Sequence, residues 1–273
     1  YKDQADIILD YVSVDTTHQE SIDLSWTILH PERIFNDSIS LYKKAVGEPT
    51  WQFLRRIPAS ARTFTDGGNF TSDTSYEYYL ILSNLCEEEL TTNIHTTVLL
   101  TGEADTLNDV LSFQWNHYQG WDSGVENYEL WRKLDNASGF RMIAVVPGGE
   151  NAWSAQIASD GFEHQYVIRA KQKSGSAESW SNTIDFNFEH PVFVPNVFTP
   201  NGDDFNQYFH ISKVELYKDS ELIVMDRWGR KVFKAKGYQN DWDAEDLSNG
   251  VYYYVLNLNN NNKIIKGTVS ILR

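Results

Sequence analysis

The sequence predicts an all-β protein built from tandem sandwiches. Aromatic residues make up 14 % of the 273 residues, and aromatic side chains favour pleated, half-buried strand surfaces. Short stretches of alternating apolar and polar residues recur along the chain, separated by turn-forming stretches such as Asp66-Gly67-Gly68-Asn69. A pattern of landmarks in the first third of the chain also returns in the second third. These observations predict several compact β-sandwiches joined by short connections.

The repeat defines the first two predicted domains. Tyr78 follows Trp26 by 52 residues, and Tyr166 follows Trp115 by 51 residues. A stretch rich in apolar residues and ending in basic ones begins 15 residues after each Trp. This order resembles fibronectin type III modules, in which such a Trp and Tyr lie in facing sheets of one core. The resemblance implies two modules, at residues 1–97 and 98–190, with Trp26 packed against Tyr78 and Trp115 packed against Tyr166.

The third predicted domain covers residues 191–273 and is also all-β. Its last strand, residues 265–271, alternates between an apolar and a polar face. Residues 251–256 are apolar on both faces and predict a central strand covered on both sides. Residues 221–225 and 231–233 flank the turn Arg227-Trp228-Gly229 and predict a hairpin. We therefore expect a C-terminal Ig-like sandwich of about seven strands.

Charge separates this last domain from the rest of the chain. Residues 191–273 contain ten Lys or Arg and ten Asp or Glu, so the whole net charge of −15 falls on residues 1–190. An acidic surface repels phosphates and argues against a nucleic-acid partner. This difference in net charge suggests that the neutral domain binds a partner that the acidic residues 1–190 do not bind. No stretch approaches the length of apolar sequence that a transmembrane helix needs.

The C-terminal domain carries an ordered set of motifs. It opens on Pro195-Asn196-Val197-Phe198-Thr199-Pro200-Asn201-Gly202-Asp203, contains Arg227-Trp228-Gly229, and ends near Lys266-Gly267-Thr268. In this order the motifs resemble the type B C-terminal domain of type IX secretion cargo, also called the gliding-motility-associated C-terminal domain. The resemblance covers residues 192–273.

The resemblance implies a secretion signal that directs export across the outer membrane and attachment at the cell surface. The implied partners are the type IX outer-membrane translocon and a PorP/SprF-like outer-membrane protein. Fibronectin-like modules before such a signal suggest a gliding adhesin. Five residues are predicted to contact the partner or define the signal: Arg227, Trp228, Gly229, Lys266 and Gly267. The alternative is that Trp228 belongs to the core and that Gly229 only satisfies the turn.

Two acidic turns are candidate calcium loops, because oxygen donors at alternate positions are what Ca²⁺ requires. The candidate ligands are Asn201 and Asp203 in the first turn, and Asp241 and Asp243 in the second. Turns that hydrogen-bond their own backbone explain the same residues and are the favoured interpretation. In the first turn, Asp204 and Gln207 depart from the pattern that the resembled family usually shows. No cofactor is expected.

The sequence contains no convincing catalytic motif, so we do not expect an enzyme. The seven histidines are scattered, and no Gly-rich phosphate loop or Gly-x-Ser-x-Gly turn is present. The single cysteine, Cys86, is followed by three Glu residues that disfavour a thiolate. The main alternative function is a carbohydrate-binding or spacer tail of a secreted polysaccharide-degrading enzyme. Exposed Trp121, Trp153 or Trp180 would then form the sugar platform.

Short motifs add two weaker hypotheses. N-glycosylation sequons occur at Asn36, Asn69 and Asn136. Asp15-Thr16-Thr17, Asp37-Ser38-Ile39 and Asp105-Thr106-Leu107 resemble the O-glycosylation motif of Bacteroidota. The first residues lack the basic and apolar regions of a signal peptide, so we expect this chain to be the tail of a longer protein.

Overall fold

The computed structural model describes residues 6–33, 38–83, 89–135, 137–158, 160–259 and 263–273. These residues form strands and two short 3-10 helices, as the all-β prediction requires. The chain divides into two compact units. Unit 1 contains residues 1–158 and 162–188, and unit 2 contains residues 159–161 and 189–273.

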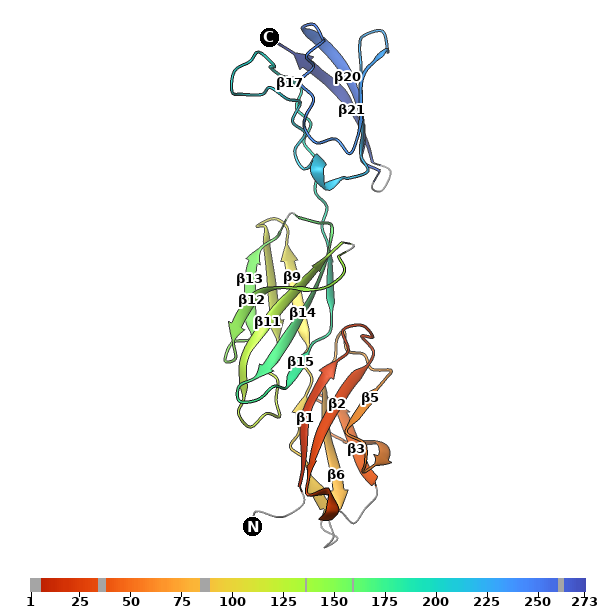
Figure 1. Cartoon of the computed structure of the whole chain (residues 1–273), viewed down its shortest axis with the longest axis vertical. Helices are drawn as coiled ribbons and strands as arrows, with labels where there is room; N and C mark the ends of the chain where they lie inside the picture. The colour runs from red at the N-terminus through yellow and green to blue at the C-terminus, as the bar shows by residue number, and fades with distance from the viewer. Residues whose placement is uncertain (1–5, 34–37, 84–88, 136, 159, 260–262) are drawn as a thin grey trace. The chain divides into compact units, whose positions relative to one another are not determined.

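The first module of unit 1 is a sandwich of two sheets (Figure 1). A three-stranded sheet has the order β1-β2-β5, and the facing sheet has the order β4-β3-β6-β7, with β8 also on β6. The strands are β1 (Asp6–Val14), β2 (Ile22–Leu29), β3 (Ser38–Ala45), β4 (Gln52–Pro58), β5 (Thr63–Asp66), β6 (Tyr76–Ser83), β7 (Glu89–Thr91) and β8 (His95–Thr96), with a 3-10 helix η1 at Pro31–Arg33.

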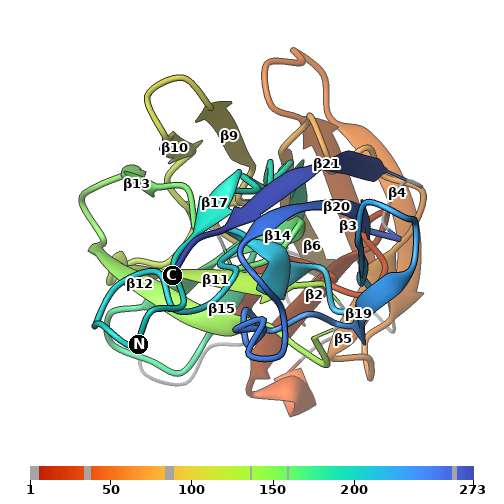
Figure 2. The ribbon, with the colours of Figure 1, turned by 90° about the horizontal axis from the view of Figure 1, so that it is seen from above.

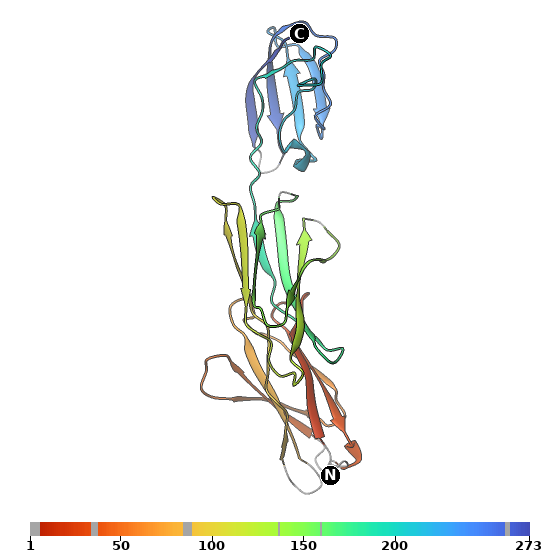
Figure 3. The ribbon, with the colours of Figure 1, turned by 90° about the vertical axis from the view of Figure 1, so that its left-hand side faces the viewer.

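The second module repeats this topology, strand for strand. One sheet has the order β13-β10-β9, and the other has the order β12-β11-β14-β15, with β16 also on β14. The strands are β9 (Leu100–Asp105), β10 (Val110–Trp115), β11 (Val125–Leu134), β12 (Arg141–Pro147), β13 (Ala152–Gln156), β14 (Glu163–Gln172), β15 (Glu178–Trp180) and β16 (Ile184–Asn187). The predicted boundary at residues 97 and 98 falls between β8 and β9. In Figure 3 the two modules run from red to orange and from yellow to green.

The cores confirm that the landmark aromatics are packing residues. Trp26, Tyr78, Trp115 and Tyr166 are all buried. The two modules also share a register irregularity. In each module the pairing of the third strand with the fourth shifts at the equivalent position. These shifts lie between Leu41 and Tyr42 and between Leu130 and Trp131. The two modules are therefore two copies of one fibronectin type III-like sandwich.

Within unit 1, strand β1 of the first module is hydrogen-bonded to the second module. A register shift around Asp10 leaves its carbonyl outside the ladder with β2, and the indole Nε1 of Trp121 donates to that oxygen at 2.7 Å. The Val12 amide donates to the hydroxyl of Tyr118 at 3.1 Å, and the hydroxyl of Ser179 donates to the Val12 carbonyl at 2.7 Å. We call this set of contacts the module joint.

A buried histidine completes the module joint. The Nδ1 atom of His95 lies 2.7 Å from the Tyr118 hydroxyl. Burial lowers the pKa of His95 to about 4, so its imidazole is neutral at pH 7. Gly120 packs directly against the ring: a Cβ atom there would lie 2.2 Å from a carbon of His95, and its φ of +121° also suits only glycine. Any larger residue at position 120 would force the joint apart.

Unit 2 contains a single five-stranded sheet of order β17-β21-β20-β18-β19. Figure 2 shows β17, β21 and β20 side by side. The strands are β17 (Val197–Phe198), β18 (Glu221–Met225), β19 (Lys231–Lys236), β20 (Gly250–Asn257) and β21 (Ile264–Ile271), and a 3-10 helix η2 spans Val214–Leu216. The predicted hairpin around residues 226–230 is confirmed, because β18 pairs antiparallel with β19.

The layer that covers this sheet differs from the prediction. Irregular segments, and not a second sheet, bury one face of the strands. Phe209 and Trp242 come from these segments and contact aromatic side chains near β17 and β20, with ring centroids 5.5 Å apart for Phe198–Trp242 and 5.9 Å apart for Phe209–Tyr254. Within the described residues, unit 2 thus has five of the about seven strands expected for the Ig-like sandwich.

The prediction that β20 is covered on both faces was wrong, although its central position was right. Tyr252, Tyr254 and Leu256 are buried, whereas Val251 is 54 % exposed and Tyr253 is 49 % exposed. Both sets of side chains are apolar, so residue type alone does not distinguish the buried face of β20 from its open face. The open face of β20 becomes part of the candidate site.

Candidate recognition surface

The hairpin turn between β18 and β19 is held by one carboxylate. The Oδ1 atom of Asp226 accepts the amide N–H groups of Trp228 at 2.9 Å and Arg230 at 3.0 Å. Its Oδ2 atom lies 3.1 Å from the Arg230 guanidinium. Desolvation opposes ionisation, but these bonds hold the pKa of Asp226 below its usual value. Gly229 has a φ of +79°, which glycine adopts without strain. The turn is therefore fixed without help from the Trp228 side chain.

Trp228 projects from the tip of this turn into solvent. Its side chain is 79 % exposed, so the alternative that Trp228 belongs to the core is wrong. The guanidinium of Arg227 lies over the indole, 5.1 Å from the ring centroid. Exposed Trp and Arg side chains are the residue types that most often dominate protein–protein binding energies. The structure gives Trp228 no packing role that would explain its presence.

The turn borders a shallow hollow on the open face of the sheet. The hollow has a volume of about 510 Å³ and is lined by Met225, Asp226, Arg227, Gly229, Tyr253, Tyr254, Val255, Lys266, Gly267 and Thr268. Four of the five residues predicted to contact a partner therefore share one cavity, and the fifth, Trp228, contacts Arg227. We call the hollow and the hairpin tip the recognition surface.

Gly267 also has a structural reason to be glycine. It pairs with Tyr254 on the neighbouring strand, and a Cβ atom at Gly267 would lie 2.5 Å from the Tyr254 hydroxyl. The Tyr254 ring therefore fills the space that a side chain would need. Gly267 lines the hollow through its backbone and is required by the packing of Tyr254, whereas Arg227, Trp228 and Lys266 offer side chains to a partner.

The open face of the sheet is cationic around an apolar centre. The register places Ile223, Met225, Tyr253 and Val255 on this face, with Lys231, Lys234, Lys236 and Lys266 on its two sides. Glu221 also belongs to this face and binds Lys234 at 2.8 Å. Met225, Tyr253 and Val255 were not predicted from the sequence as site residues. Strict period-two counting from buried Tyr252 and Tyr254 would have placed Tyr253 and Val255 here.

The first candidate calcium loop is filled by a side chain of its own. The Nε2 atom of Gln207 lies 3.1 Å from Asn201 Oδ1, 2.9 Å from Asp203 Oδ1 and 3.0 Å from the Phe205 carbonyl. The Asp203 pKa is lowered, chiefly by the amide N–H of Phe205. An amide NH₂ group thus occupies the centre where a cation would bind.

The second candidate loop shows no such arrangement. The carboxylate of Asp243 accepts the amide of Glu245 at 3.1 Å, which is an Asx turn, and Asp241 is exposed. Among the described residues, no group of three His, Cys, Asp or Glu side chains is placed to hold a metal ion.

We expect Gln207→Asp to convert the first loop into a calcium site. The substitution removes the amide that fills the centre and adds a carboxylate next to Asn201 and Asp203. Isothermal titration of Ca²⁺ should give a Kd on the order of 10⁻³ M for the variant, as in extracellular modules. The unsubstituted chain and Gln207→Ala are the controls. Equal binding by all three proteins would contradict this explanation.

The three Trp residues proposed as a sugar platform are engaged in other contacts. Trp121 is buried in the module joint, so the expectation that it is exposed was wrong. Trp180 and Trp131 both contact the Arg169 guanidinium, at 5.0 and 4.8 Å, and their ring centroids lie 5.7 Å apart. Trp153 packs on Phe113 at 6.0 Å. Among the described residues, no ring contact joins any two of the three.

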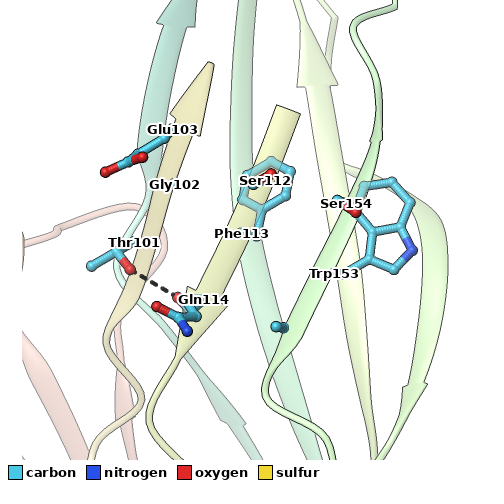
Figure 4. A pocket seen from close by; sticks show the side chains of 9 residues that line it. Thr101, Gly102, Glu103, Ser112, Phe113, Gln114, Trp153 and Ser154 are labelled. Carbon is cyan, nitrogen blue, oxygen red and sulfur yellow. Dashed lines mark hydrogen bonds between the residues drawn. The ribbon is translucent and has the colours of Figure 1, made fainter. Parts of the chain in front are cut away.

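A second hollow is lined by Trp153, Phe113 and several polar side chains. It lies on the β9-β10-β13 sheet and has a volume of about 510 Å³. Figure 4 shows Thr101, Glu103, Ser112, Gln114 and Ser154 around it. Phe113 is buried and Trp153 is half-buried against it, so the hollow lacks the exposed aromatic platform of the alternative function.

The glycosylation motifs fall in different environments. Asn69 is 3 % exposed and its amide donates to the Asp66 carbonyl at 2.7 Å, so this sequon is not accessible in the folded chain. Thr106 lies in an exposed turn next to Leu107, which is 95 % exposed. Thr16 is partly buried. Asn36, Asp37, Cys86 and Asn136 lie outside the described residues.

Comparisons with known proteins identify the C-terminal domain. Residues 192–271 match the family described as the CHU_C Type IX secretion signal domain. No curated protein matches the chain. Among solved structures, the FN1-FN3 domains of chicken CNTN1 align over 98 % of both chains with 10 % identity and a TM-score of 0.27, a value too low to bear on the arrangement of the domains. No helix among the described residues is long and apolar enough to span a membrane. Residues 192–271 thus match a type IX secretion signal domain, which implies that the chain is exported by the type IX secretion system.

Proposed function

We propose that this chain is the C-terminal part of a gliding adhesin that remains attached to the cell surface after export. In this proposal the signal domain binds the outer-membrane translocon and a PorP/SprF-like outer-membrane protein through the recognition surface. The two fibronectin-like modules act as spacers that hold the upstream part of the protein away from the membrane. The proposal includes no catalytic step and no cofactor.

One observation supports this proposal above the others. A solvent-exposed Trp–Arg pair lies at the tip of a rigid turn beside an apolar hollow, within the domain that directs export. Such a surface costs solubility and contributes nothing to the fold, so binding is the simplest reason for it. The internal contacts of Trp121, Trp153 and Trp180 count against the carbohydrate-binding alternative.

The test is export of a reporter in cells with and without the secretion system. The reporter is fused to residues 1–273 or to residues 1–188, which lack the signal domain. We expect the first fusion on the surface of secreting cells, where external protease degrades it, and the second inside the cell. Release of the first fusion into the medium would contradict attachment. Equal export of both fusions would contradict the function itself.

A further inference from the structure

The two edges of the sheet in unit 2 are protected very differently. Strand β19 forms one edge and carries exposed Lys231, Lys234 and Lys236, and its pairing with β18 contains a register shift. Charged side chains and bulges of this kind prevent other strands from adding to an edge. The opposite edge is formed by β21 and the two-residue strand β17, and it has only one lysine.

Strand β17 covers only the end of β21. The two strands pair at Val197↔Ser270 and Phe198↔Ile271. The ladder between β17 and β21 cannot continue regularly toward residue 195, because Pro195 has no N–H group to donate. Before Pro195, Phe193 forms an isolated bridge with Ser212 and not with β21. Within the part of the chain that the structure describes, no strand pairs with residues 264–268 on this side.

The direction of the unpaired groups follows from one hydrogen bond. The Ser270 amide donates to the Asn196 carbonyl at 2.8 Å, toward the β17 side. Alternate residues of a strand direct their N–H and C=O groups to the same side, and the pairing of β21 with β20 runs from Ile264 to Ile271 without a register shift. Ile264, Lys266 and Thr268 therefore direct their backbone groups outward at the free edge.

The surroundings of this edge select for a negatively charged partner. Lys266 and Arg227 line the hollow beside the edge. The two carboxylates nearest to this face, Asp226 and Glu221, are already bound to Arg230 and Lys234. On the other side of the sheet, Ile265 and Gly267 offer an apolar surface without a long side chain. Side chains of an added strand alternate between the two faces of the sheet. Acidic residues would then lie on the face of the hollow, and apolar residues would lie on the face of Ile265 and Gly267.

We propose that residues 264–268 of β21 bind an extended segment of the export partner as an added β-strand, with acidic and apolar residues alternating along it. Main-chain hydrogen bonds would supply affinity, and the hollow would supply specificity. A second copy of this chain is a poor occupant, because pairing two β21 edges brings Lys266 side chains of like charge together. This inference rests on the proposed function, since it describes how the signal domain is bound.

The first part of the test examines the edge itself. Amide hydrogen exchange of residues 1–273 is measured at single-residue resolution. We expect fast exchange at Lys266 and Thr268 and slow exchange at Ile265 and Gly267. Slow exchange at all four amides would mean that the edge is already covered and would overturn the proposal.

The second part compares export of matched variants of residues 1–273. Lys266→Glu should reduce the amount of surface protein by about ten-fold, the result of losing roughly 1.4 kcal/mol of binding. Lys231→Glu makes the same change of charge at the protected edge and should be exported normally. Thr268→Pro removes an outward N–H group without changing the charge of the edge and should also block export. Thermal unfolding of each purified variant checks that it folds.

The outcomes separate the competing explanations. Equal loss with Lys266→Glu and Lys231→Glu would indicate a general attraction to an anionic membrane and would overturn the added strand. Normal export of folded Thr268→Pro would show that the Lys266 side chain, and not the backbone, is recognised, which also overturns the added strand. If Thr268→Pro does not fold, the exchange pattern and the two charge variants still decide. Failure of the unsubstituted fusion to be exported would instead refute the proposed function.

Discussion

The double substitution Arg227→Ser with Trp228→Ala is expected to reduce export by at least about a hundred-fold. Binding sites lose about 2–4 kcal/mol when a central Trp or Arg is truncated, and two such losses greatly weaken recognition. The fold should not suffer, because Trp228 is 79 % exposed and the turn is held by Asp226. Gly229 is kept, since its φ of +79° would be strained by another residue.

This prediction is checked by quantifying surface protein on intact cells. Phe205→Ala is the matched control, because Phe205 is 73 % exposed in the same domain but lies in a different loop. Unfolding temperatures of both purified variants should lie close to that of the unsubstituted chain. Export of the folded double variant at normal levels would remove Arg227 and Trp228 from the recognition surface.

The substitution Asp66→Ala is expected to destabilise the first module by about 3–5 kcal/mol, the usual cost of leaving one member of a buried ion pair alone. The side chain of Asp66 is 6 % exposed and lies 2.7 Å from the Lys43 ammonium. It also accepts the hydroxyl of Tyr78 at 2.7 Å. Burial and the nearby Asp66 raise the pKa of Tyr78, so the hydroxyl keeps its proton and remains a donor.

Urea denaturation of residues 1–273 measures this effect. Glu221→Gln serves as the control, because its partner Lys234 is 50 % exposed and such pairs contribute at most about 1 kcal/mol. The double variant Asp66→Leu with Lys43→Met should recover most of the loss, since it removes both charges from the interior. A cost below about 1 kcal/mol for Asp66→Ala would show that solvent reaches Lys43 readily.

The sequence predicted the repeated modules because their cores depend on a few large side chains at fixed spacing. Trp26, Tyr78, Trp115 and Tyr166 are all large side chains that are buried in these cores. The hairpin was equally readable, since a turn residue with positive φ, Gly229, separates two alternating stretches. These signals lie in the sequence itself, so they can be recognised without knowledge of the fold.

The features that the sequence could not predict depend on contacts between distant segments. Phe209 and Trp242 cover the sheet of unit 2 from irregular segments, and no periodicity marks such a layer. Trp228 and Trp121 have similar polar neighbours in the sequence, yet one is exposed and the other is buried. Gln207 fills the calcium-like loop only because three oxygens converge on its amide in space.

The module joint has a mechanical consequence if the chain is pulled, as the proposed adhesin would be on a gliding cell. Strand β1 of the first module is bound by Trp121, Tyr118 and Ser179 of the second. A force that peels β1 from its own sheet must also break these bonds, and the loss of β1 uncovers the side chains of the neighbouring module. Tension on β1 therefore acts on both modules, because peeling this strand away breaks hydrogen bonds within the first module and to the second.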